Sequence, residues 1–197
     1  MRVDHPNYVL RTSRYANRRI LLARTDISVG VASVSFALPA TFESYELVAS
    51  GILVQTDDVE LHVRFSTDAG ATYLSAAGSY EYYGAHVYFD VTFSAGFSSQ
   101  GSASATQIAI SNTDAGAGVG NGTGEGSNVR IIMANANSDA MSGFIHGDAS
   151  GTDASARISY SSFTGRLLAL GRVNGLQILA SSGNLTGGKF SLYGVGR

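Results

Sequence analysis

Apolar and polar residues alternate along much of the chain from Ile27 onward, and this period of two is the pattern of half-buried β-strands. Residues 59–66 follow it without a break, and residues 80–93 follow it over a longer stretch. Segments rich in glycine, serine, asparagine and aspartate separate the alternating stretches, as turns require. Further predicted strands are residues 27–38, 45–55, 106–112, 128–135, 141–147, 156–163, 166–170, 175–181 and 188–195.

The same pattern leaves little room for helices. Residues 15–23 lack a sustained apolar stripe, and Gly171 and Gly175 interrupt the helix-like stretch 167–179. Evenly spaced short strands with polar turns predict an all-β fold, an antiparallel β-sandwich of jelly-roll-like type. We assign this sandwich to residues 27–197 and leave residues 1–26 as an extended N-terminal arm.

The parity of each strand predicts which side chains form the core. Within residues 80–93 we assign Val87 and Phe89 to the buried face, and His86 and Tyr88 to the more exposed one. The expected core residues are Val63, Phe65, Val87, Phe89, Val91, Ile108, Ile110, Val129, Ile131, Phe190 and Leu192.

Composition narrows the class of protein. Of the 197 residues, 44% are hydrophobic, which is enough to build a core, and only 14% are charged. Because the chain has no cysteine, disulfides, thiolate metal sites and cysteine nucleophiles are excluded. No apolar run approaches the ~20 residues needed to span a bilayer, so we expect no membrane partner.

Basic residues are concentrated near the N-terminus. Residues 1–24 contain six arginines and one aspartate, a net charge of about +5, whereas the rest of the chain has seven basic and fourteen acidic residues, about −7. Such an arm suits bidentate contacts with carboxylates of a protein partner or neutralisation of nucleic-acid phosphates. We favour the protein partner because the rest of the chain is acidic. The residues expected to bind it are Arg2, Arg11, Arg14, Arg18, Arg19 and Arg24.

No motif for catalysis or for a cofactor stands out. The glycine run from Gly116 to Gly126 lacks the spacing of a phosphate-binding loop, and we interpret it as a mobile loop or as one that a neighbouring subunit orders. The four histidines are scattered, without the spacing of zinc ligands. We interpret Asp57, Asp58 and Asp153 as turn-forming residues rather than calcium ligands. We therefore expect no catalytic residue, no metal and no cofactor.

Aromatic residues gather in one predicted strand. The alternation places Tyr80, Tyr82 and Tyr88 on the same, less buried face as His86. This stripe suits a subunit contact, since tyrosine has an apolar body and a polar tip. It also suits a glycan platform, although the chain has no tryptophan, which such platforms usually include. The candidate contact residues are Tyr80, Tyr82, His86 and Tyr88.

Three stretches carry a resemblance to a known family. Residues 61–73, which follow the strand that begins YELV at residue 45, contain the pattern L-x-x-R-x-S-x-D-x-G-x-T-[YF]. Residues 174–179 read NGLQIL, and residues 182–194 read SGNLTGGKFSLYG. Together they resemble β-sandwich virion proteins of tailed bacteriophages, from tail fibres, tail tips or head decorations. The resemblance covers residues 45–197, and its motifs are structural. Ala69 stands where the family more often has glycine, and Ser191 where arginine is commoner.

The resemblance implies a non-enzymatic structural protein located in the virion. We expect a homo-oligomer that the N-terminal arm anchors to other virion proteins, with no membrane partner and no nucleic acid. One alternative is a carbohydrate-binding module that recognises a host surface glycan. Another is a glycan-degrading enzyme, which needs a pair of carboxylates that the sequence does not identify.

Overall fold

The structure is a computed structural model, and it describes residues 19–90, 92, 94–112 and 116–196. These residues form twelve β-strands and no helix, which confirms the all-β class. The strands are β1 (Arg19–Ile27), β2 (Ser33–Ala37), β3 (Ser44–Val54), β4 (Leu61–Ser66), β5 (Tyr80–Phe89), β6 (Ala95–Ala105), β7 (Ile108–Ala109), β8 (Gly126–Ala134), β9 (Phe144–Thr152), β10 (Ile158–Leu167), β11 (Gly175–Ala180) and β12 (Leu185–Val195).

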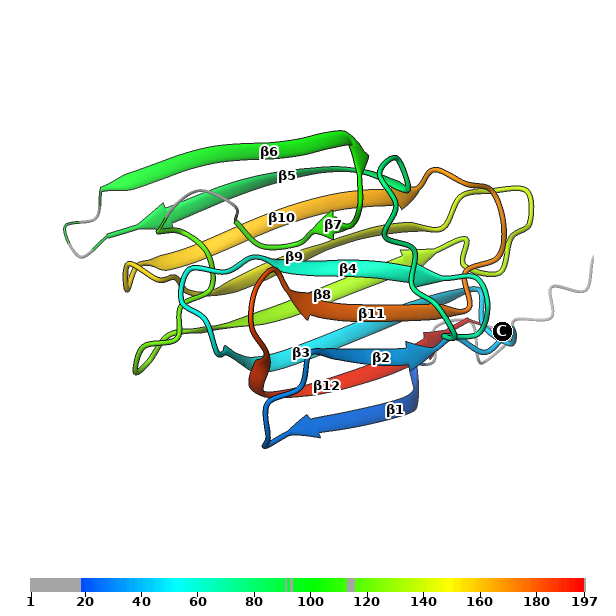
Figure 1. The fold of residues 1–197 in the computed structure, drawn as a ribbon, viewed down its shortest axis with the longest axis horizontal. Coiled ribbons are helices and arrows are strands. Elements are labelled where there is room, and N and C mark those ends of the chain that lie inside the picture. The colour runs from blue at the N-terminus through cyan, green and yellow to red at the C-terminus, as the bar shows by residue number, and fades with distance from the viewer. Residues whose placement is uncertain (1–18, 91, 93, 113–115, 197) are drawn as a thin grey trace, which may run out of the picture.

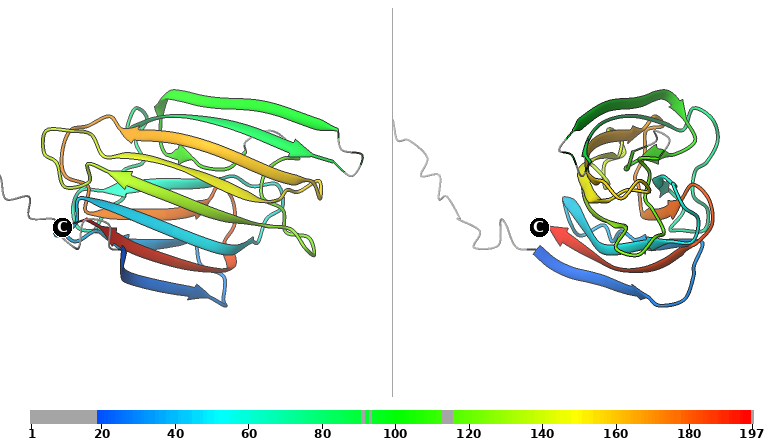
Figure 2. Two further views of the ribbon diagram at one scale, coloured as in Figure 1. Left: turned by 180° about the vertical axis from the view of Figure 1, so that it is seen from behind. Right: turned by 90° about the vertical axis from the view of Figure 1, so that its left-hand side faces the viewer.

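The strands form two antiparallel sheets, which confirms the predicted β-sandwich. The larger sheet has eight strands in the order β1-β12-β3-β8-β9-β10-β5-β6, and the smaller has four in the order β2-β11-β4-β7. Figure 1 shows the smaller sheet in front of the larger one, and Figure 2 shows the larger sheet curving around it. The larger sheet therefore has an inner face against the smaller sheet and an outer face turned away from it.

The hydrophobic core lies between the two sheets. Phe65 of β4 and Tyr80 of β5 meet edge to face across the interior, with ring centroids 5.6 Å apart. Most of the core residues expected from strand parity are fully buried, which confirms that part of the sequence analysis. These residues are Val63, Phe65, Ile108, Ile110, Val129, Ile131, Phe190 and Leu192.

Strand β5 has the opposite parity to the one predicted. His86 is buried and Val87 only partly so, while the Phe89 side chain is 44% exposed. The reason is that both faces of β5 carry large aromatic or aliphatic side chains, so the alternation does not show which face is buried. Polar atoms of the inward side chains find hydrogen-bond partners in the interior. The Tyr80 hydroxyl accepts a hydrogen bond from Phe65 N at 2.8 Å and donates to Leu74 O at 3.0 Å. Val91, which the alternation also assigned to the core, lies outside the described residues.

Residues 19–26, which the charge pattern assigned to the arm, belong to the sandwich. They form most of β1, which pairs with β12 at one edge of the larger sheet. Leu22, Ala23 and Ile27 pack against the core, so apolar burial holds this strand in place despite its arginines. The arm therefore comprises residues 1–18 at most, and these lie outside the described residues.

Candidate interaction surface

The outer face of the larger sheet exposes large apolar side chains in its β9-β10-β5-β6 half. Phe97 of β6 and Ile158 of β10 are each 71% exposed. The register places Val87 beside Phe97 and Tyr160, and it pairs Phe89 with Ile158. These five residues form one continuous group across three strands, which we call the apolar patch: Val87, Phe89, Phe97, Ile158 and Tyr160. Exposed apolar groups of this kind mark interaction surfaces.

Strand β6, beside the apolar patch, is an edge strand without charge. Its sequence is AGFSSQGSASA, and no other strand of the described residues pairs with its outer edge. Edge strands of soluble proteins usually carry charged residues or proline that prevent pairing with another chain. The opposite edge strand, β1, follows this rule with Arg19, Arg24 and Asp26. Gln100 fixes β6 from the inner side, because its Nε2 donates to Ser111 O at 2.8 Å.

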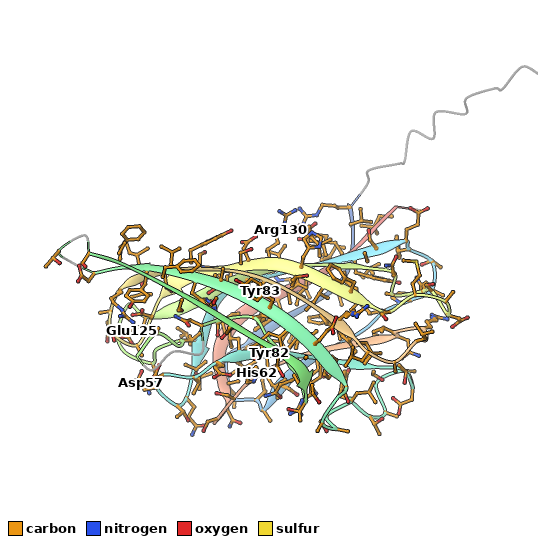
Figure 3. The ribbon with its side chains drawn as sticks, turned by 90° about the horizontal axis from the view of Figure 1, so that it is seen from above. Asp57, His62, Tyr82, Tyr83, Glu125 and Arg130 are labelled. Atoms are coloured by element: carbon orange, nitrogen blue, oxygen red, sulfur yellow. The ribbon has the colours of Figure 1, made fainter. Side chains whose placement is uncertain are left out.

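A surface pocket of about 610 Å³ lies beyond the apolar patch, where β5, β6, β9 and β10 run side by side. We call it the Tyr83 pocket. Tyr83 and Phe144 supply its aromatic wall, and Arg166 Nε contacts Glu81 Oε1 at 2.5 Å. Figure 3 shows Tyr83 of β5 and the neighbouring Tyr82 on opposite sides of the strand. The lining residues are Glu81, Tyr82, Tyr83, Gly101, Ser102, Ala103, Phe144, Thr164, Gly165 and Arg166.

Glycine at position 101 keeps the Tyr83 pocket open. A Cβ atom there would lie 2.9 Å from the Tyr82 carbonyl oxygen and 3.4 Å from the Tyr83 ring. Thr164 completes the polar lining, and its hydroxyl donates to Ile145 O at 3.2 Å. The pocket therefore has an aromatic surface, a half-exposed ion pair and a hydroxyl oxygen that can still accept a hydrogen bond.

Two arginines share one buried carboxylate at the other end of the outer face. Arg19 Nε and Arg130 Nε each lie 2.7 Å from a different oxygen of Glu46, whose side chain is buried while both arginines are half exposed. The Arg19 guanidinium also stacks 4.3 Å from the centre of the Tyr193 ring. The hydrogen bond that Arg130 donates to Glu46, together with the negative charge of Glu46, raises the pKa of Arg130. One carboxylate thus holds two cations at the surface, and Asp148, the register partner of Arg130 on β9, adds a second negative charge beside them.

Two of the six arginines predicted to bind a partner, Arg19 and Arg24, lie within the described residues, and they form different ion pairs. Arg19 joins this Glu46 cluster, together with Arg130, which the sequence analysis missed because it lies on a distant strand. Arg24 instead pairs with Asp26 of its own strand at 2.9 Å, so its charge is already balanced. The hydrogen bond between the two raises the pKa of Arg24 and lowers that of Asp26. Arg2, Arg11, Arg14 and Arg18 lie outside the described residues.

The predicted aromatic stripe is not an exposed platform. Tyr80 and His86 are buried on the inner face, and Tyr82 and Tyr88 are partly buried there. Nδ1 of His86 lies 2.5 Å from the Ser161 hydroxyl. Burial raises the pKa of Tyr80 to about 12, as expected for a phenol removed from water. The expectation that these residues form the less buried face is therefore wrong, since Tyr83 is the tyrosine of β5 that faces outward.

The glycine-rich loop is held by carboxylates of the chain itself. Asp58 accepts hydrogen bonds from Gly116 N at 2.7 Å and Gly118 N at 3.0 Å, and Asp57 accepts one from Asn121 N at 3.2 Å. These contacts fix residues 116–121 to the loop that contains Asp57 and Asp58. The carboxylates therefore fix loops, as predicted for turn-forming residues. The described residues contain no group of three or more side chains suited to bind a metal.

His62 also has a structural environment. Gln107 Nε2 donates to its Nδ1 at 2.8 Å, so Nε2 carries the proton and donates to Glu60 at 2.7 Å. Both ring nitrogens are used within the small sheet, away from the outer face described above.

In the part of the chain that the structure covers, no helix is long and apolar enough to cross a membrane. Comparisons of the chain with protein-family models, with curated proteins and with solved structures find no match.

Proposed function

We propose that this chain is a non-enzymatic structural protein of a tailed-phage virion, a tail-fibre, tail-tip or head-decoration component that assembles with further copies of itself. The observation that carries this proposal is the uncharged edge strand β6 beside the apolar patch. Monomeric proteins usually carry charged residues or proline on an edge strand, which prevent pairing with another chain. An uncharged edge is available for pairing in an assembly.

The occupant of this surface is a second copy of the chain. Antiparallel pairing of β6 with β6 is self-complementary, because a two-fold axis makes residue i of one strand face residue j of the other, and residue j of the first face residue i of the second. The side chains of β6 are small apart from Phe97 and Gln100, and none carries a charge that would repel its own copy. Pairing would satisfy the unpaired backbone groups of both edges and join the two apolar patches across one continuous sheet.

The resemblance to virion proteins supports the location. Its first motif makes a tight turn after β4, in which Asp68 accepts hydrogen bonds from Thr72 N at 2.9 Å, Thr72 Oγ1 at 2.6 Å and Ser66 Oγ at 2.7 Å. These bonds, chiefly that of the Thr72 hydroxyl, lower the pKa of Asp68 to about 2. The last motif forms most of β12, whose Phe190 and Leu192 side chains are buried in the core. The residues of both motifs thus have structural roles, as expected for a family of structural proteins.

The Glu46 cluster supports contacts with neighbouring virion proteins. The exposed guanidinium groups of Arg19 and Arg130 suit carboxylates, which accept paired hydrogen bonds from this planar group. Arg19 is also the first described residue after the basic segment 1–18. An acidic surface of a neighbour would therefore meet the cluster and the arm together.

A charge placed on the edge tests the proposed assembly. We expect the wild-type chain to self-associate, and Ser99→Lys to weaken the association about tenfold or more. Ser99 lies next to the centre of β6, so pairing of the two strands along their length would bring the lysines of the two copies close together beside the two-fold axis. Sedimentation equilibrium and native mass spectrometry measure this change.

The matched control is Ser162→Lys, which adds the same charge to the same face on β10, away from the edge. It should associate like the wild type. A monomeric wild-type chain, or equal association of the two variants, would contradict pairing through β6.

A further inference from the structure

We propose that the Tyr83 pocket binds a neutral saccharide. The pocket volume of about 610 Å³ lies within the range of about 300–1,000 Å³ typical of small-ligand sites. It opens on the outer face, and its lining does not include Tyr80, His86 or Tyr88 of the inner face. Saccharide binding would depend on side chains that line the pocket, whereas the proposed assembly depends on the backbone edge of β6. Either proposal can therefore fail without the other.

The aromatic wall suits one face of a sugar ring. Tyr83 is 55% exposed and Phe144 is 36% exposed, so both rings remain accessible at the surface. A pyranose has an apolar face of C–H groups, which packs against an aromatic ring, while its hydroxyls stay in contact with water or polar groups. A fully apolar ligand would need deeper enclosure than this open site gives, because most of its surface must leave water.

The Arg166–Glu81 ion pair suits the hydroxyls of the same sugar. Both side chains are half exposed, so their remaining hydrogen-bonding capacity faces the pocket and solvent. Arg166 donates and Glu81 accepts, and two adjacent sugar hydroxyls offer one acceptor and one donor at matching spacing. Because the two charges cancel, the site has no net charge to attract a sialylated or sulfated sugar, and a neutral sugar fits best.

Two further residues of the pocket suit a sugar: Thr164 provides a hydrogen-bond acceptor, and Gly101 leaves the surface of the sheet uncovered. The Thr164 hydroxyl donates to Ile145 O, which leaves its oxygen lone pairs for a ligand donor. Gly101 lines the pocket without a side chain, so a ring can approach the sheet there. The aromatic wall, the ion pair, the hydroxyl and the bare backbone together suit a pyranose ring, which has an apolar C–H face and several hydroxyls.

The test is a titration of the isotope-labelled full chain with maltotriose, cellotriose, lactose and mannobiose, followed by amide chemical shifts. Saccharide binding should shift the amides of residues 81–83, 101–103 and 164–166. Tyr83→Ala and Arg166→Met should each weaken binding about tenfold or more. The control Tyr160→Ala removes an exposed tyrosine of the same face outside the pocket, and should change affinity less than about twofold.

Three outcomes would overturn the proposal: no shift with any of the four sugars at millimolar concentration, shifts that persist in Tyr83→Ala, or a preference for sialyllactose over lactose. Repeating the titration with Ser99→Lys separates the two proposals. Binding by that variant would support the saccharide site even if the chain does not assemble through β6. Loss of binding in both Tyr83→Ala and Tyr160→Ala would indicate a general effect on the sheet and would count against the pocket.

Discussion

Replacement of Phe190 with alanine is expected to lower the free energy of unfolding by about 3–5 kcal/mol, the usual cost of removing a buried aromatic ring. Phe190 lies on β12, between β1 and β3 in the larger sheet, and is fully buried. Its register partners are Thr25 of β1 and Ala49 of β3, both too small to fill the space that its ring would leave. Urea denaturation followed by fluorescence or circular dichroism measures the change.

Phe89→Ala is the matched control, because it makes the same chemical change on β5. Its side chain is 44% exposed on the outer face, so we expect a loss below about 1 kcal/mol. Equal losses for the two variants would mean that the faces of β5 are assigned the wrong way round. In that case the apolar patch would be part of the core rather than a contact surface.

Replacement of Asp153 with alanine is expected to cost about 3–5 kcal/mol, because it removes one partner of a buried ion pair. The Asp153 carboxylate is buried and accepts hydrogen bonds from Ser155 N at 3.0 Å, Arg157 N at 2.9 Å and Arg157 Nε at 2.9 Å. Arg157 in turn donates to Gly116 O at 2.7 Å. Without Asp153 a mostly buried guanidinium loses its counter-charge, and the glycine-rich loop loses a fixed donor.

Denaturant unfolding and amide hydrogen exchange of residues 116–126 measure these two effects. Asp139→Ala, which removes an exposed aspartate, should leave both unchanged within about 0.5 kcal/mol. Wild-type stability and wild-type exchange in Asp153→Ala would show that the ion pair does not hold the loop.

The alternation of the sequence predicts most strands because burial on one face of a sheet imposes a period of two. It fails at β6, where residues 94–105 show low complexity and no apolar period, yet pair with β5 along almost their whole length. This strand forms through backbone hydrogen bonds to β5, and its side-chain pattern does not indicate a strand. Parity at β5 fails because tyrosine suits either face when its hydroxyl finds a buried partner, as Tyr80 does.

The candidate surface could be predicted only in part. Arg19 was identified from local charge, but its partner Glu46 and the second arginine, Arg130, come from β3 and β8. Likewise, Glu81 and Arg166 are 85 residues apart in sequence and meet because β5 and β10 pair. A single sequence shows no signal for such contacts, since strand order rather than spacing brings them together.

The most direct test of the proposed assembly and of the proposed virion location is a cryo-electron microscopy map of purified particles of a tailed phage that carries the coding sequence of this chain. We expect density for the eight- and four-stranded sandwich in several copies, with β6 of one copy against β6 of the next and an acidic neighbour beside Arg19 and Arg130. Particles without this sandwich, or copies whose β6 edges face solvent, would contradict the proposal.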